Sequence, residues 1–132
     1  MIKGISHITL VARDIEKSAD LFKKLFGARE VYSSGEAYHS LSKEKYLLVN
    51  GIWIAIMEGD PLKEKTYNHI AFKVDTADLA RYPEIIAGLG LETESGRERK
   101  PEEGQSIYFY DYDNHLFELH TGTLEERLKY YR

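Results

Sequence analysis

The strongest constraint on the fold is an internal repeat in the sequence. The segment Ser6-His-Ile-Thr-Leu10 has a counterpart in Asn68-His-Ile-Ala-Phe72, which places His7 and His69 62 positions apart. Polar and apolar residues alternate over His7-Ile-Thr-Leu10, as they do in a half-buried β-strand, and the second segment mirrors the first. A helical pattern closed by a glycine follows each one. We therefore predict an α+β protein built from two modules, each with the order strand, helix, strand, strand, strand.

The first module is predicted to span about residues 1–60. Its first strand covers residues 4–12 and is followed by a helix that begins at the N-cap Asp14 and closes at Gly27. A short strand over about residues 29–32 comes next.

A hairpin is predicted to complete the first module. It runs from residue 38 to residue 58 and turns at Asn50-Gly51, a strong hairpin signal. Its second strand, residues 52–57, is continuously apolar, so both faces of that strand should be covered.

The second module is predicted over about residues 66–122. Pro83 should divide its helical segment into a short turn after Thr76 and a second helix that begins near the proline. A short strand over residues 91–93 and a charged loop over residues 96–104 follow.

The chain is predicted to end in two strands and a helix. The two strands flank a polar turn over residues 111–114. Thr123 and Glu126 form a capping box, which predicts a C-terminal helix over about residues 123–131. All 132 residues should belong to one domain.

Composition excludes several classes of protein. No cysteine is present, so thiolate ligands, disulfides and a cysteine nucleophile are excluded, and any metal must be held by nitrogen and oxygen. The net charge is −4 without a basic stripe, so nucleic acid is not an expected partner. The apolar runs are too short to span a membrane, and no signal sequence precedes the first strand, so we expect a cytoplasmic protein.

Three residues on three predicted strands form a candidate metal site. His7 and His69 occupy equivalent positions of the repeat, and Glu118 lies on the last strand between apolar neighbours. Each residue alone has an ordinary explanation, as a structural histidine or as a solvated glutamate on an edge strand. If the modules pack about a pseudo-twofold axis, however, both histidines face a common centre. Two imidazoles and one carboxylate suit manganese, iron, zinc or nickel, and they leave coordination positions open for substrate and water.

The sequence also resembles a known family over essentially its whole length. The paired modules with His7, His69 and Glu118 are similar to the vicinal oxygen chelate superfamily, and within it to the fosfomycin resistance proteins. The likeness is carried by four segments, which contain residues 6–10, 67–72, 106–111 and 117–127. Residues 40–46 and 53–59 resemble the FosX-type branch, which hydrates the antibiotic. The resemblance implies a manganese-dependent homodimer in which His7 comes from one chain, and His69 and Glu118 from the other.

The resemblance also implies roles for further residues. Glu44 matches the general base that activates water for attack on the epoxide, although the run Lys43-Glu44-Lys45 also fits an ordinary charged surface. Tyr67 is a plausible gate beside His69. The positions that match phosphonate-binding residues, or that could contribute from the charged loop, are Thr9, Ser106, Tyr108, Arg127, Arg97 and Arg99.

Three other activities occur with this fold, and the sequence leaves them as alternatives. A thiol transferase would open the same epoxide with glutathione or a bacillithiol-type thiol, but Glu98 stands in the loop where such relatives place a lysine. A ring-cleaving dioxygenase would use the same ligand types with ferrous iron, but no additional histidine is convincingly placed for its acid–base step. A drug-binding protein of the bleomycin resistance type needs no metal triad. Fold alone does not separate these activities.

Overall fold

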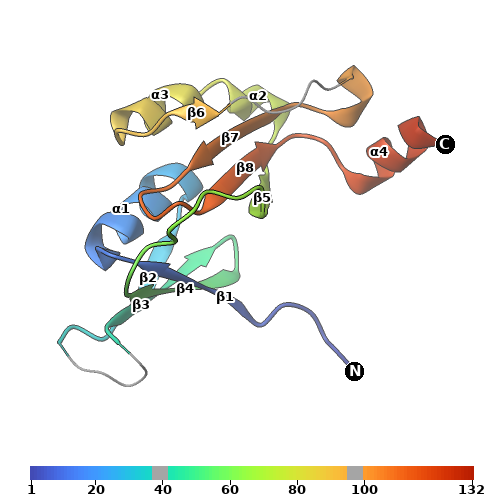
Figure 1. Ribbon diagram of the computed structural model, residues 1–132. Helices are drawn as coiled ribbons and strands as arrows, with labels where there is room; N and C mark the ends of the chain where they lie inside the picture. Colours follow the sequence, from blue (N-terminus) through green and yellow to red (C-terminus); the bar gives the residue numbers. More distant parts are fainter. Residues whose placement is uncertain (37–41, 95–99) are drawn as a thin grey trace. The chain divides into compact units, whose positions relative to one another are not determined.

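The computed structural model describes residues 1–36, 42–94 and 100–132. The chain divides into two units, residues 1–63 and residues 64–132. Each unit contains one four-stranded sheet (Figure 1).

The sheet of the first unit has the order β1-β4-β3-β2. The edge strand β1 (His7–Ala12) pairs in parallel with β4 (Ile52–Glu58). β3 (Glu44–Val49) then pairs in the antiparallel sense with β4 and with β2 (Arg29–Ser33). Helix α1 (Ile15–Phe26) connects β1 to β2 and packs against β3 and β4.

The ends of α1 follow from two residues that the sequence singles out. Asp14 accepts hydrogen bonds from the backbone N–H groups of Glu16 and Lys17, which satisfies donors that a helix start leaves unpaired. Gly27 closes the helix with φ of 63°, a conformation that favours glycine. Between these caps, Leu21 and Phe22 are fully buried. The predicted helix is therefore confirmed at both ends.

The hairpin prediction is confirmed at its turn and is partly wrong at its start. Asn50 and Gly51 have φ of 47° and 82°, as a tight turn between β3 and β4 requires. β3 begins at Glu44, which is later than predicted, and residues 37–41 lie outside the described residues. The centre of β4 is buried, but Ile52 at its start is 40 % exposed, so in one chain this strand is covered only in part.

The sheet of the second unit repeats the same topology, with the order β5-β8-β7-β6. β5 (His69–Lys73) is parallel to β8 (Leu116–His120). β8 is antiparallel to β7 (Ser106–Tyr110), which pairs with the two-residue strand β6 (Thr93–Glu94). The repeat seen in the sequence is thus a repeat of topology.

In the second unit, a proline and a backbone hydrogen bond determine where helix α3 begins and ends. α2 (Thr76–Leu79) is separate from α3 (Tyr82–Gly88), and a proline stands in the first turn of α3, as predicted. The strand predicted from residue 91 starts later, because the N–H of Leu91 donates to the carbonyl of Ile86 and so closes the end of α3.

Two further short helical segments belong to the second unit. A 3₁₀ turn, η1 (Pro101–Glu103), lies in the charged loop. α4 (Leu124–Tyr131) has the predicted capping box between Thr123 and Glu126. Among the described residues, no helix has the length and apolar character needed to cross a membrane.

Candidate metal and anion site

Strand register brings the candidate residues of the second unit onto one face of its sheet. Residues paired across neighbouring strands project to the same side. Tyr108 on β7 pairs with Glu118 on β8, and Ser106 pairs with His120. Glu118 pairs in turn with Ala71 on β5, and His69 lies two residues before Ala71 on the same face.

His69 and Glu118 are in direct contact. Nε2 of His69 lies 2.9 Å from Oε1 of Glu118, and Nδ1 lies 2.7 Å from the carbonyl oxygen of Tyr67. A carbonyl only accepts hydrogen bonds, so Nδ1 carries a proton and donates it. Nε2 therefore faces the carboxylate, and either a proton or a metal cation must lie between the two acceptors. A backbone carbonyl that fixes the outer nitrogen is the usual support of a metal-ligating histidine, so this pair fits a metal.

The surroundings of Glu118 hold the carboxylate in place. Glu118 is 4 % exposed, and its Oε2 accepts a hydrogen bond of 2.5 Å from the hydroxyl of Ser106. Tyr108 is buried beside it, and the Tyr108 hydroxyl lies 3.1 Å from that of Tyr67. Tyr67 itself is 62 % exposed and its ring packs against His69, which places it at the rim of this site.

A cation lies at the other end of the same cluster. Arg127 on α4 places Nη2 3.3 Å from Nε2 of His120, and Nδ1 of His120 lies 2.7 Å from the hydroxyl of Ser106. Sequence reasoning did not assign His120 to the site. The available signal was strand alternation, because His120 lies two residues after Glu118 and therefore on the same face.

In the first unit, another set of candidate residues shares a face. His7 pairs with Trp53, and Thr9 pairs with Ala55 on β4. The His7 and Trp53 rings are 4.2 Å apart, and both His7 and Thr9 are exposed. On β3, Tyr46 pairs with the same Ala55, so β3 contributes to this face as well.

Glu44 lies on this face too and is not a surface charge. It is 3 % exposed, and among the described residues its Oε2 is a buried oxygen without a hydrogen-bond partner. The hydroxyl of Tyr46 bonds to the Glu44 carboxylate, and this bond, with burial, raises the pKa of Tyr46. Lys45 points to the opposite face and is held between Glu16 and Glu30 at 3.1 and 3.2 Å.

The structure therefore gathers the predicted residues in two sets. Within the described residues, no three His, Asp or Glu side chains lie close enough together to hold a metal ion. His7 belongs to the first unit, whereas His69 and Glu118 belong to the second. Arg97 and Arg99 lie outside the described residues. The residues found together in the second unit are Tyr67, His69, Ser106, Tyr108, Glu118 and Arg127.

Comparison with known proteins gives consistent matches. Residues 4–119 match the family Glyoxalase/Bleomycin resistance protein/Dioxygenase superfamily. Fosfomycin resistance protein FosX from Listeria monocytogenes is 56 % identical over 131 residues, which cover 99 % of this chain and 98 % of that protein. Metallothiol transferase FosB from Bacillus licheniformis is 35 % identical over 135 residues, which cover 99 % and 83 %.

A solved structure is similar over the whole chain. It is the crystal structure of a Glu-to-Gln variant of FosX from Listeria monocytogenes, complexed with Mn(II) and 1S,2S-dihydroxypropylphosphonic acid. It matches with a TM-score of 0.91 and 53 % identity, and the match covers 100 % of both chains. The predicted α+β fold is therefore confirmed.

Proposed function

We infer that this chain, which belongs to the Glyoxalase/Bleomycin resistance protein/Dioxygenase superfamily, is a manganese-dependent enzyme that hydrates the epoxide of fosfomycin. The FosX relative is considerably more similar than the FosB metallothiol transferase, and the FosX structure holds Mn(II) with a dihydroxy phosphonate. The product is a diol, and the reaction inactivates the antibiotic. We further propose that the two units act as one domain and that the enzyme works in the cytoplasm.

The observation that carries this proposal is the buried carboxylate of Glu44. Water is a weak nucleophile at neutral pH, and a positioned base accelerates its attack by about 10²–10⁴-fold. Glu44 has an oxygen that is buried and without a hydrogen-bond partner among the described residues, so the capacity of this carboxylate to accept a hydrogen bond or a proton is not used up within them. A thiol transferase has less need of such a group, since a thiol ionises more readily than water.

We propose that His7, His69 and Glu118 hold the manganese ion. The support is their donor set of two imidazoles and one carboxylate, together with the contact between His69 and Glu118. When bound, the ion supplies Lewis-acid stabilisation for the oxygen of the opening epoxide.

The phosphonate needs donors, and we propose that Arg127 and Tyr108 supply them, with Thr9, Ser106 and Arg97 as further candidates. Arg127 carries a guanidinium, which suits a phosphonate through paired hydrogen bonds. The hydroxyl of Tyr108 lies on the same sheet face as Glu118, so substrate bound there would have its epoxide near the metal ligands. Tyr67 at the rim would cover the bound substrate.

The proposed reaction is one addition of water. Glu44 takes a proton from the water, and the water oxygen forms a bond to the epoxide carbon that carries the phosphonate. The bond from that carbon to the epoxide oxygen breaks, and its electron pair remains on that oxygen, which then takes up a proton. Attack comes from the face opposite the breaking bond. A base on a different strand from the metal ligands is compatible with that geometry.

Replacing Arg127 by alanine is expected to lower kcat/KM for fosfomycin by about 10–150-fold. The reason is that a hydrogen bond to a charged group contributes about 1.5–3 kcal/mol. The affinity for Mn(II) should stay nearly unchanged. Lys129→Ala, an exposed cation on the same helix, is the matched control and should behave as the unsubstituted enzyme. Steady-state kinetics measure both variants, and unchanged kinetics in Arg127→Ala would remove this residue from the site.

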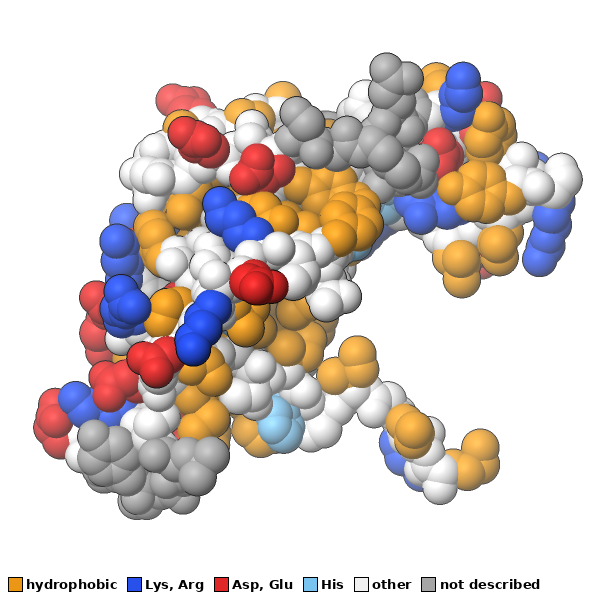
Figure 2. Space-filling view, viewed as in Figure 1, with side chains coloured by type: hydrophobic (Ala, Val, Ile, Leu, Met, Phe, Trp, Pro, Cys, Tyr) orange, Lys and Arg blue, Asp and Glu red, His pale blue; other side chains and the backbone are white. Residues whose placement is uncertain are grey.

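We also propose a homodimer that shares its active sites. The support is apolar surface that a single chain leaves exposed to solvent. Ile2 is 93 % and Ile5 is 79 % exposed. Figure 2 shows exposed hydrophobic side chains along the N-terminal segment. A twofold dimer would bury the same exposed patch of both chains.

Mixing two inactive variants is expected to restore activity. In a heterodimer of His7→Ala and His69→Ala chains, shared sites would yield one site that lacks both histidines and one that is intact. Activity should therefore reappear after the two variants are mixed and allowed to exchange chains, while each variant alone stays inactive. A monomer in sedimentation at micromolar concentration, or no recovery after proven exchange, would contradict the shared-site dimer.

Product analysis tests the function itself. Fosfomycin incubated with the protein and Mn(II) should give one new phosphorus NMR signal, that of the diol, whether or not glutathione or a bacillithiol-type thiol is present. A thioether as the main product in the presence of thiol, with little turnover in its absence, would favour the thiol transferase instead.

A further inference from the structure

A line of hydrogen bonds joins the proposed anion-binding residue to the proposed metal ligand. It runs from Arg127 to His120, from His120 to Ser106, and from Ser106 to Glu118, with distances of 3.3, 2.7 and 2.5 Å. Nδ1 of His120 also lies 3.4 Å from Oε2 of Glu118. All of these residues belong to the second unit, and none of the roles proposed above uses His120.

The chemistry of the donors fixes the direction of this line. A guanidinium has only donors, so Nε2 of His120 accepts from Arg127. In the neutral imidazole Nδ1 then carries the proton and donates it to the hydroxyl oxygen of Ser106. The hydroxyl hydrogen of Ser106 is directed to Glu118. Every donor in the line therefore faces an acceptor.

Packing holds the His120 ring in this position. Its side chain is 14 % exposed. At Gly122, a Cβ atom would lie 2.8 Å from Nε2 of His120 and 2.7 Å from the carbonyl oxygen of Glu103, so only glycine leaves room for the ring and for η1.

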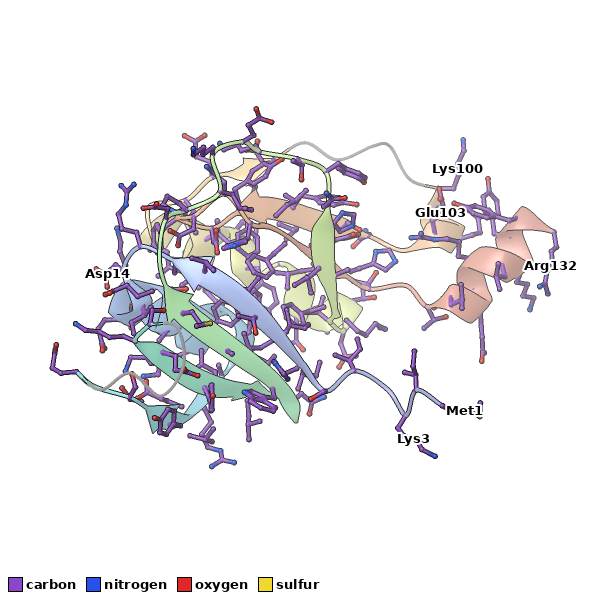
Figure 3. All side chains as sticks on the ribbon, turned by 60° about the horizontal axis from the view of Figure 1, so that its bottom comes forward. Met1, Lys3, Asp14, Lys100, Glu103 and Arg132 are labelled. Atoms are coloured by element: carbon purple, nitrogen blue, oxygen red, sulfur yellow. The ribbon has the colours of Figure 1, made fainter. Side chains whose placement is uncertain are left out.

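The helix that carries Arg127 is tied to the same region. The hydroxyl of Tyr131 donates to Oε1 of Glu103 at 2.7 Å, and Glu103 also accepts from the N–H of Lys100. Figure 3 labels Lys100 and Glu103 beside α4. The guanidinium is therefore brought to His120 by a helix that is anchored to η1.

We propose that His120, fixed as the Nδ1–H tautomer, is a positioning residue that orients the Glu118 carboxylate through Ser106 and the Arg127 guanidinium through Nε2. It does not touch the substrate. Of the two roles proposed for Ser106, holding Glu118 takes precedence over donating to the phosphonate, because its single hydroxyl hydrogen is already engaged by Glu118. The proposal rests on the proposed roles of Glu118 in metal binding and of Arg127 in anion binding.

Two variants separate the two halves of this role. The side-chain amide nitrogen of His120→Asn can take the place of Nδ1, so that variant keeps the donor to Ser106 and loses contact with Arg127. The longer side chain of His120→Gln reaches the place of Nε2, so that variant keeps an acceptor for Arg127 and loses the donor to Ser106. Either substitution retains a neutral polar residue.

The expected result is a split between two affinities. In His120→Gln the affinity for Mn(II), measured by EPR without substrate, should fall by about 10-fold or more, as is usual when the support of a metal ligand is removed. Its affinity for inorganic phosphate, measured by calorimetry on the metal-free protein, should be unchanged. In His120→Asn the phosphate affinity should fall severalfold, and the Mn(II) affinity should stay near that of the unsubstituted protein. Equal losses of both affinities in both variants, or no loss in either variant, would overturn the proposal.

A second test uses the unsubstituted protein, so its result does not depend on whether a variant folds. Nitrogen-15 NMR of the metal-free protein should show His120 with its proton on Nδ1. A proton on Nε2 would overturn the proposal. Neither test uses turnover of fosfomycin, so a protein that shows the split but fails to hydrate the antibiotic would contradict the proposed function and not the role of His120.

Discussion

Replacing Glu44 by glutamine is expected to lower the rate of fosfomycin hydration by about 10²-fold or more. Glutamine keeps the shape of the side chain but cannot take a proton from water. Affinity for Mn(II) and for the diol product should be retained, because none of the proposed metal or phosphonate ligands is changed. Phosphorus NMR of the reaction gives the rate, and Mn(II) titration confirms that the site is intact.

The matched control is Glu36→Gln, the same chemical change at an exposed residue of the same unit. The Glu36 side chain is 92 % exposed and pairs with Lys43 at 3.1 Å, so its loss should leave the rate unchanged. Any thiol addition by the enzyme should survive in Glu44→Gln, since a thiol brings its own nucleophilicity. Diol formation near the unsubstituted rate in Glu44→Gln would show that Glu44 is not the base.

Replacing His69 by alanine is expected to abolish metal-dependent activity through loss of Mn(II) binding. The affinity should fall by more than the roughly 10–100-fold that outer-shell changes cost, because a direct ligand is removed. The fold should survive, since the His69 side chain is partly exposed at 23 % and lies outside the core. EPR of free Mn(II) measures the affinity, and circular dichroism checks the fold.

His115→Asn is the control for this experiment. His115 bonds to Asp111 at 2.8 Å in the turn before β8, and asparagine can keep a donor there. Its Mn(II) affinity should equal that of the unsubstituted protein. If His69→Ala bound Mn(II) as tightly as the control does, the metal site would be misassigned.

Much of the fold could be predicted because local signals and packing agree. The N-cap Asp14, the turn at Asn50-Gly51 and the capping box at Thr123 each act within a few residues, so the sequence alone reveals them. The start of β6 could not be found this way. It depends on a hydrogen bond from Leu91 back to α3, which leaves little trace in the residue pattern.

The burial of Glu44 shows the limit of sequence reasoning about the site. The run Lys43-Glu44-Lys45 is typical of a solvated surface, yet Glu44 and Lys45 are 3 % and 4 % exposed on opposite faces of β3. Lys45 tolerates burial because Glu16 and Glu30 pair with it. Although burial alone would raise the pKa of Glu30, the hydrogen bonds from Lys23 and Lys45 hold that pKa below its usual value. Only tertiary structure supplies such partners.

The sequence predicts the contact of His69 with Glu118 better than it predicts the role of His120. The repeat marks the two histidines, and the last strand carries the carboxylate. His120 needs the position of α4, because its partner Arg127 approaches from a helix that follows the sheet. Strand alternation alone places His120 on the right face but does not give it a partner.

Hydration in oxygen-18 water, with enzyme in excess so that each molecule turns over once, tests the central claim most directly. If Glu44 acts as a base, the first turnover should place the heavy oxygen on the product carbon that carries phosphorus, where it shifts the phosphorus NMR signal. An unlabelled diol from that first turnover, with the label appearing only later, would mean that a protein oxygen attacks the epoxide. That result would contradict activation of water by Glu44.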